Sequence, residues 1–263
     1  MPGVISYSQK TTSGDNRNRS SYSTASISPG SNKLILAWVY SIAASLPNTP
    51  TASGNGLTWV QIDTQSDADN VRRLTLFRAM GASPSSGALT LSFGGQTQTG
   101  AAWSVVEYDG MATTGANGSD AIVQSAKNAS PSTTDSLTVT LGAFSDTDNA
   151  TAAGFGIPLN VSNIPTEGSG FTDTGQSNQN NPNLAIGSEF KDANDTTADM
   201  TSTGYNIPWV GIAVEIGIPV ATATNPKVWT GSAWEVKPVK VWNGSAWVEK
   251  PVKVWNGSAW VEV

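Results

Sequence analysis

The chain has 263 residues, carries a formal net charge of −6, and only 13% of its residues are charged. It contains no His and no Cys, which excludes Ser-His-Asp catalysis, His-ligated zinc, disulfides and thiolate metal sites. The acidic balance, without a stripe of Lys and Arg, argues against a nucleic-acid partner bound through its phosphates.

Short apolar runs separated by turn residues recur through most of the chain, which is typical of an all-β sandwich. The few Ala-rich stretches are interrupted by Gly or Pro, so we expect little regular helix. The strands predicted from these runs are 3–9, 21–28, 33–42, 57–65, 72–80, 88–93, 101–110, 121–127, 136–141, 150–159, 183–190 and 209–217.

Two of the runs, 33–42 and 209–217, are almost continuously apolar and are predicted to lie in the core. The runs 101–110 and 209–217 also share a pattern of Trp, small apolar residues, Val and Glu. We interpret residues 1–112 and 113–220 as two halves of one jelly roll, with their strands interleaved across two sheets. A chance match between the two runs is the alternative.

The C-terminal part of the chain repeats with a period of 13 residues from Lys227 onward, and it holds six of the ten Trp residues. Two prolines among small and β-branched residues indicate an extended linker before it. The sequence therefore predicts a jelly-roll-like antiparallel sandwich over 1–218, a linker over 219–226 and three Trp-rich β-hairpin repeats over 227–263.

Each repeat contains a turn signal. The Asn-Gly pairs Asn243-Gly244 and Asn256-Gly257 favour type I′ turns, in which both residues have positive φ. A two-residue turn at Asn243-Gly244 places Trp242 opposite Ser245. One face of this hairpin then carries Val239, Val241, Ala246 and Val248, and the other carries Lys240, Trp242, Ser245 and Trp247.

The tryptophans of the repeats are the main candidate site. Because hairpins with short arms are marginal in water, we expect these indoles to form the core of the repeat module or of an oligomer. The alternative is that they are exposed platforms for sugar stacking or for a protein partner. The interface or glycan-stacking candidates are Trp229, Trp234, Trp242, Trp247, Trp255 and Trp260.

Acidic loops provide the only candidates for a cation; we expect no cofactor, and Ca²⁺ is the one alternative. Carboxylates of this spacing can supply some of the six to eight oxygens that Ca²⁺ takes, but no complete twelve-residue calcium loop is present. We therefore expect these acids to be solvated turn residues that stabilise the ends of strands. The candidates are Asp146, Asp148, Asp192 and Asp195, with further acids at Asp67, Asp69 and Asp199.

Carboxylate catalysis would need two acids in one cleft. Glu107, Asp109 and Glu215 lie on or beside apolar strands, where acids more often satisfy backbone donors, so we expect no enzymatic activity. We also expect neither a signal peptide nor a transmembrane segment.

The repeat "KVWNGSAWVEKPVKVWNGSAW" resembles the C-terminal repeats of tail and other virion proteins of tailed bacteriophages, over residues 227–263. The segments "GLTWVQIDTQ" and "AAWSVVEYDG" resemble a jelly-roll-like domain of phage and bacterial surface proteins. The resemblance implies a non-enzymatic structural or adhesive component at the virion surface: a head decoration or fibre, or a tail receptor-binding protein.

The same resemblance implies partners. These are further copies of the chain, with a trimer favoured, other virion proteins and a host surface glycan; neither nucleic acid nor membrane insertion is expected. The alternatives are a carbohydrate-binding module of a bacterial surface protein and a subunit of a self-assembling extracellular filament.

Overall fold

The computed structural model describes residues 4–131, 135–159, 165–202, 207–219, 227–255 and 260–262. It is all-β, with 56% strand, 3% helix and antiparallel pairing, as predicted. The chain divides into two compact units, Met1–Pro219 and Val220–Val263. Within the described ranges, no helix has the length and apolar character needed to cross a membrane.

The first half of the larger unit forms two sheets. A five-stranded sheet has the order β1-β8-β3-β6-β5, and a three-stranded sheet has the order β2-β7-β4. The strands are β1 (Ser6–Asp15), β2 (Ser21–Ile27), β3 (Leu34–Ile42), β4 (Thr51–Ser53), β5 (Val60–Ser66), β6 (Arg72–Ala79), β7 (Gly87–Ser92) and β8 (Gly100–Asp109).

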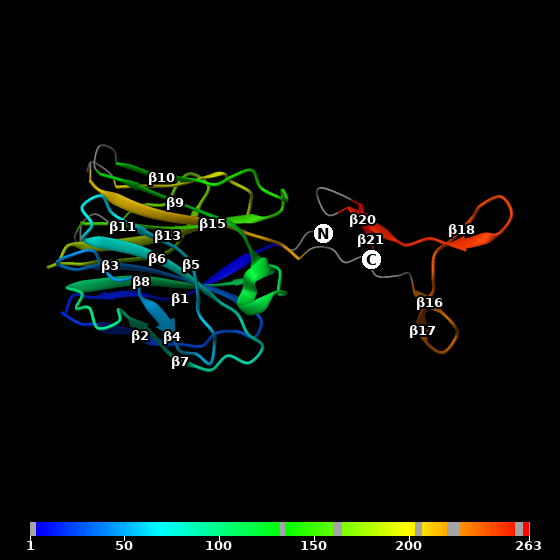
Figure 1. The fold of residues 1–263 in the computed structure, drawn as a ribbon, viewed down its shortest axis with the longest axis horizontal. Coiled ribbons are helices and arrows are strands. Elements are labelled where there is room, and N and C mark those ends of the chain that lie inside the picture. The colour runs from blue at the N-terminus through cyan, green and yellow to red at the C-terminus, as the bar shows by residue number, and fades with distance from the viewer. Residues whose placement is uncertain are drawn as a thin grey trace. The chain divides into compact units, whose positions relative to one another are not determined.

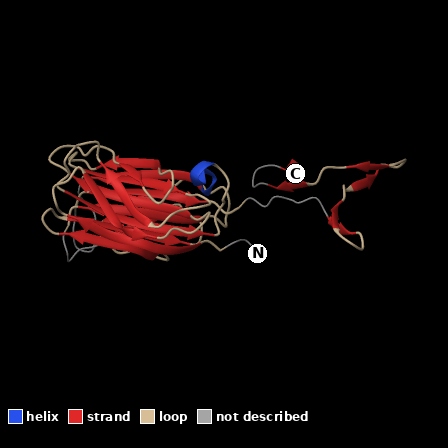
Figure 2. Cartoon of the chain, turned by 90° about the horizontal axis from the view of Figure 1, so that it is seen from below, coloured by secondary structure: helices blue, strands red, loops and turns tan. Residues whose placement is uncertain are grey.

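The second half repeats this plan after the short 3-10 helix η1 (Ala116–Ala121), which lies at one end of the stacked strands in Figure 2. A five-stranded sheet has the order β12-β13-β11-β15-β9, and β10 pairs with β14. The strands are β9 (Ile122–Ser130), β10 (Ser136–Thr140), β11 (Ala150–Ile157), β12 (Thr172–Gln179), β13 (Leu184–Lys191), β14 (Thr197–Thr201) and β15 (Trp209–Ile216).

The two five-stranded sheets match strand for strand, with β1, β8, β3, β6 and β5 corresponding to β9, β15, β11, β13 and β12. The shared pattern of Trp, Val and Glu therefore marks equivalent strands, β8 and β15. The predicted interleaving of the halves is wrong, because each half builds its own complete sandwich. The larger unit thus has four layers, from β10 at the top of Figure 1 to β7 at the bottom.

Three apolar cores separate the layers. The central core lies between the five-stranded sheets and takes side chains from both halves, and an outer core lies beneath each small sheet. Strands β3 and β15 are buried along almost their whole length, as the continuous apolar runs predicted. Both contribute to the central core and to an outer core, which explains why neither run alternates.

Where the two halves pack together, structurally equivalent positions carry residues of very different size. Strand pairing sets Ile35 opposite Glu107 and Thr151 opposite Glu215, which aligns Trp38 with Gly154 and Tyr40 with Gly156. A Cβ at Gly154 would lie 2.5 Å from Cγ of the Trp38 ring, and one at Gly156 would lie 2.5 Å from Cδ2 of the Tyr40 ring. Both aromatic side chains are fully buried. Large residues of β3 therefore fill space that glycines of β11 leave open.

Three strands were not predicted: β4, β12 and β14. Strand β12 reads TDTGQSNQ, lies at a sheet edge and is largely half-exposed, so its sequence shows no apolar alternation. Strand β14 spans only Thr197–Thr201 and pairs with β10, which places Asp199 within a strand and not in the expected acidic loop. Polar edge strands are held by backbone pairing, which hydrophobic patterning does not detect.

Over its described residues, 227–255 and 260–262, the smaller unit contains three two-stranded antiparallel sheets. In each, Trp lies opposite Trp, as in the pairs Trp229·Trp234, Trp242·Trp247 and Trp255·Trp260. The strands are β16 (Lys227–Trp229), β17 (Trp234–Val236), β18 (Lys240–Trp242), β19 (Trp247–Glu249), β20 (Lys253–Trp255) and β21 (Trp260–Glu262).

The predicted two-residue turn at Asn243-Gly244 is wrong. Trp242 faces Trp247, so the loop comprises residues 243–246, and of the Asn-Gly pair only Gly244 has positive φ, at 100°. The Asn243 side-chain oxygen accepts hydrogen bonds from the backbone N–H groups of Ser245 and Ala246 at 2.9 and 2.8 Å. This side-chain turn replaces the backbone turn. Asn256 and Gly257 lie outside the described residues.

Candidate functional site

The tryptophan pairs occupy the closest cross-strand positions of their hairpins. Backbone hydrogen bonds join Val239 with Lys250 and Asn243 with Ala246, so Trp242 and Trp247 form a non-hydrogen-bonded pair between them. Their ring centroids are 5.8 Å apart and the planes are inclined by 59°. Contacts between paired aromatic rings stabilise hairpins by about 0.5–1.5 kcal/mol.

The first hairpin reproduces this geometry. The Trp229 and Trp234 rings are also 5.8 Å apart, inclined by 54°. Exposed fractions are 53% and 66% for this pair, and 52% and 65% for Trp242 and Trp247. The two pairs therefore present the same indole surface outward. The side chains of Trp255 and Trp260 lie outside the described part of the chain.

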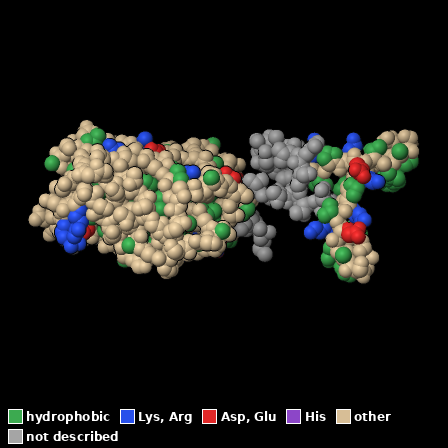
Figure 3. Space-filling model, turned by 60° about the horizontal axis from the view of Figure 1, so that its bottom comes forward, with side chains coloured by type: hydrophobic (Ala, Val, Ile, Leu, Met, Phe, Trp, Pro, Cys, Tyr) green, Lys and Arg blue, Asp and Glu red, His purple; other side chains and the backbone are tan. Residues whose placement is uncertain are grey.

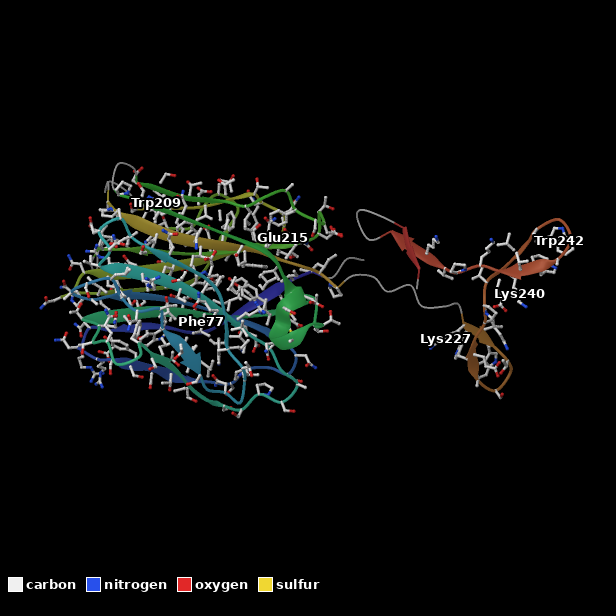
Figure 4. All side chains as sticks on the ribbon, in the orientation of Figure 1. Phe77, Trp209, Glu215, Lys227, Lys240 and Trp242 are labelled. Carbon is white, nitrogen blue, oxygen red and sulfur yellow. The ribbon has the colours of Figure 1, made fainter. Side chains whose placement is uncertain are left out.

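Charged side chains flank the indoles of the second hairpin. Lys240 lies opposite Glu249, on the same face as the two tryptophans, and the charged atoms are 3.7 Å apart. The valines Val241 and Val248 occupy the other face. Figure 4 shows Lys240 and Trp242 on this hairpin. The predicted separation into a Trp/Lys face and a valine face is therefore correct for the strand residues.

The first hairpin differs at the flank. Val236 lies opposite Lys227, where the second hairpin has Glu249 opposite Lys240. The acid of the first hairpin, Glu235, occupies the opposite face and pairs with Lys237 at 2.7 Å. The first hairpin thus keeps the tryptophan pair but lacks a carboxylate beside it.

The two units also differ in charge and surface. Residues 220–263 contain five Lys and three Glu, whereas residues 1–219 contain 17 acidic and nine basic residues. In the view of Figure 3, hydrophobic side chains are scattered singly over the larger unit, but on the hairpins they gather beside Lys and Glu. The hairpins are therefore a weakly cationic, apolar part of an acidic protein.

The calcium candidates make contacts with protein donors. Asp192 accepts a hydrogen bond from the Ile5 N–H at 3.0 Å, and Asp195 lies 2.6 Å from the Lys191 ammonium. Asp146 accepts from the Asp148 N–H at 3.0 Å. Among the described residues, no group of three or more His, Cys, Asp or Glu side chains is arranged to hold a metal ion. Turn and loop stabilisation accounts for these contacts.

Asp67 and Asp69 lie in the turn between β5 and β6. The Asp67 side chain is buried, accepts from the backbone N–H groups of Val71 and Arg72 at 3.1 Å, and pairs with the Arg72 guanidinium at 2.9 Å. Asp69 lies 3.8 Å from the same guanidinium. Asp67 therefore fixes the turn that leads into β6.

Glu215 and Glu107 have equivalent structural roles. The fully buried Glu215 carboxylate accepts from Gln124 on β9 at 2.6 Å, and from Asn149 and the Ser145 backbone N–H in the loop before β11 at 2.5 and 3.1 Å. Glu107 likewise bonds to an edge strand and to the loop before β3. Its partners are Lys10, at 2.8 Å, and the Gly30 N–H, at 2.6 Å.

Asp109 ends β8 and pairs with Lys33. The hydrogen bond from Lys33 lowers the pKa of the Asp109 carboxyl below its usual value. Together, the partners of Glu107, Asp109 and Glu215 hold loops and edge strands in place.

Glu189 is a buried acid that the sequence reasoning missed. It is fully buried on β13, with one carboxylate oxygen 2.9 Å from the Gly168 N–H, and burial raises its pKa to about 8. Its equivalent in the first half is Phe77, which marks the position as a core one. The signal was a Glu within the predicted strand 183–190.

Glu189 predicts a pH-dependent stability. Because its pKa is raised from 4.5 to about 8 on folding, the folded state binds more protons between these values than the unfolded state. The free energy of unfolding should therefore fall as pH rises from 5 to 8, by up to about 1.4 kcal/mol per pH unit. Urea denaturation of the protein and of Glu189→Gln checks this, since the variant should show a smaller slope. Parallel pH curves would contradict it.

A shallow hollow lies where β1 of the first half meets β13 of the second. Its volume is about 310 Å³, and Tyr7, Phe190, Lys191 and Asp192 are among its lining residues. The partly exposed Tyr7 ring lies 5.5 Å from that of Phe190. One aromatic surface with nearby charges makes this hollow the second candidate site, after the hairpins.

No family model, no curated protein and no solved structure matches this chain.

Proposed function

We propose that the protein is a non-enzymatic structural and adhesive component of a phage virion. In this proposal the larger unit is displayed on the particle, and the tryptophan hairpins attach to another surface. One observation carries the proposal: the four tryptophans of the first two hairpins are each more than half exposed, in pairs of matching geometry. Exposed apolar clusters rimmed by polar groups are typical of interaction sites.

Two further observations support it. The repeat sequence resembles C-terminal repeats of phage virion proteins, and the acids best placed for catalysis, Glu107 and Glu215, have their carboxylates engaged by protein donors. The proposed partners are further copies of the chain, as a trimer, and other virion proteins. Light scattering at micromolar concentration tests this assembly, and a strict monomer, both whole and truncated at Pro219, would count against it.

Ending the chain at Pro219 is expected to abolish attachment and leave the larger unit folded. The division of the chain after Pro219 and the complete cores of the larger unit are the physical reasons. Binding of the whole and truncated proteins is measured on host cells and on particles that lack the protein. Circular dichroism and thermal unfolding provide the control for folding.

The opposite outcomes are equally informative. Unchanged attachment by the truncated chain would contradict the role given to the hairpins. If the truncated chain bound cell-wall glycans, the hollow beside Tyr7 would become the site, and a carbohydrate-binding module of a bacterial surface protein would be the better assignment. Filaments formed by the purified chain alone would favour the extracellular filament subunit.

A further inference from the structure

We propose that the first two tail hairpins each bind one sugar unit of a repetitive polysaccharide, so that a single chain engages the polymer at two points. This inference rests on the proposed function, in which the hairpins are the attachment part of the chain. It adds the chemical class of the ligand and the face of the hairpin that binds it.

The geometry of the tryptophan pair selects the outer face. A sugar held between two parallel indoles would need contacts of about 3.5–4.0 Å on both sides, and hence roughly 7–8 Å between the rings. The centroids of Trp242 and Trp247 are 5.8 Å apart and the planes are inclined by 59°. No sugar fits between them, so the ring stacks on the exposed outer surface of the pair.

The flanking charges suit a sugar at that position. A pyranose has an apolar face, which covers an indole, and an edge of hydroxyl groups that need hydrogen-bond donors and acceptors. Lys240 supplies donors and Glu249 acceptors on the tryptophan face, with half and two thirds of their side chains exposed. An apolar surface bordered by a few polar groups is the general form of a small-ligand site.

Repetition distinguishes a polymer from a second copy of the chain as the occupant. Repeats of the same sequence do not define a register, because a shift by one repeat restores nearly the same contacts. For a defined oligomer this permits misaligned assemblies, which interfaces between proteins usually avoid. On a polysaccharide, a shift by one unit gives another equivalent binding position. The repeated sequence therefore favours the polymer as the ligand.

The hairpins are not equal as sites. The second has both Lys240 and Glu249 beside its tryptophans, whereas the first has Lys227 and Val236. The second hairpin is therefore assigned as the stronger site and the first as the weaker one. Linking weak sites in one chain raises overall affinity by about 100-fold to 10,000-fold.

The test uses the full chain and soluble polysaccharides of pyranose units: a β-1,4-glucan, a galactomannan and solubilised chitin. Isothermal titration calorimetry compares each polymer with its own disaccharide. At least one polymer is expected to bind about 100-fold more tightly than its disaccharide. The joint substitution Trp242→Ile and Trp247→Ile should weaken polymer binding at least about 10-fold, since β-branched residues keep the strand but remove the flat ring.

The control alters the valine face of the same hairpin. Val241→Thr together with Val248→Thr should bind the polymer as the unaltered chain does. NMR of the backbone amides shows whether the hairpin persists in each variant. If the isoleucine variant loses the hairpin, Glu249→Val is tested instead, because it places Val opposite Lys as in the first hairpin. This variant should weaken binding about 3-fold or more while the strands remain paired.

Three outcomes would overturn the inference. They are an intact chain that binds none of the polymers, tryptophan variants that bind as well as the valine-face control, and loss of self-association in sedimentation as the main effect of the tryptophan substitutions. The last would make a second copy the occupant. If the hairpins attach the protein to particles or cells but no polysaccharide binds, this inference falls while the proposed function stands.

Discussion

Replacing Gly154 with alanine is expected to destabilise the larger unit by about 3 kcal/mol, because the added methyl group overlaps a ring that cannot move aside. The new Cβ would lie 2.5 Å from Cγ of Trp38, whose side chain is fully buried and whose Nε1 donates to the Ile212 carbonyl oxygen at 3.4 Å. In a domain of this size the midpoint of thermal unfolding should fall by about 6–12 °C.

Urea denaturation of the chain and of Gly154→Ala measures the difference. The matched control is Gly87→Ala in β7, where the nearest atom to an added Cβ is Nδ2 of Asn55 at 4.0 Å, so stability should be unchanged or slightly higher. Equal effects of the two substitutions would contradict the close packing of β3 on β11.

The equivalence of Trp38 and Gly154 allows a stricter test. Trp38→Gly alone leaves a cavity and Gly154→Trp alone overfills the core, so each should be strongly destabilising. The double exchange restores one large and one small residue at the same contact and should recover part of the loss. If the double variant is only as stable as the sum of the two single losses predicts, the two positions are not coupled.

Glu215→Leu is expected to cost about 4 kcal/mol of unfolding free energy, because it removes the shared acceptor of several buried donors. The leucine leaves the amide groups of Gln124 and Asn149 and the Ser145 N–H without this partner. Figure 4 places Glu215 in the second half of the larger unit. Calorimetric or urea unfolding measures the change in unfolding free energy. The value for Glu215→Gln is expected to lie between those of the unaltered chain and of Glu215→Leu.

Glu107→Leu is the matched comparison. Its carboxylate bonds to Lys10 and Gly30, but it is 9% exposed and the Lys10 side chain is 18% exposed, so water replaces part of what is lost and the cost should be smaller. Hydrolysis of a polysaccharide panel supplies a second readout. Turnover by the unaltered chain that disappears in Glu215→Gln or Glu107→Gln would overturn the non-enzymatic proposal.

The sequence predicted the all-β class and the central strands because those features leave direct traces in hydrophobic patterning. The uninterrupted apolar runs at 33–42 and 209–217 follow from burial on both faces of β3 and β15. Strand β12 escaped prediction because a polar edge strand is held by backbone hydrogen bonds that any residue can make.

The relation between the halves could not be predicted from the same patterns. The Trp, Val and Glu motif shows that β8 and β15 are alike, but likeness is equally compatible with one shared sandwich and with two stacked ones. The contacts that distinguish them, Trp38 on Gly154 and Tyr40 on Gly156, join residues far apart in sequence. These contacts can be identified only when the strand registers are known.

The candidate site was predicted in part. Trp242 and Trp247 lie on the opposite face from Val241 and Val248, as predicted, although the predicted turn is wrong. Loops of two and four residues both contain an even number of residues, so the alternation of side chains along the two strands is the same. The pairing of Trp with Trp was missed, since the Asn243 side chain supplies the turn that the backbone was expected to make.

The fit of β3 against β11 has a consequence for synthesis on the ribosome. The first sandwich is complete once β8 ends at Asp109, but the second is finished only at Ile216, about a hundred residues later. At about 5–20 residues per second, the face that carries Trp38 and Tyr40 stays uncovered for about 5–20 s. During that interval the growing chain exposes the Trp38 and Tyr40 rings that the finished protein buries, so aggregation should be favoured on crowded polysomes.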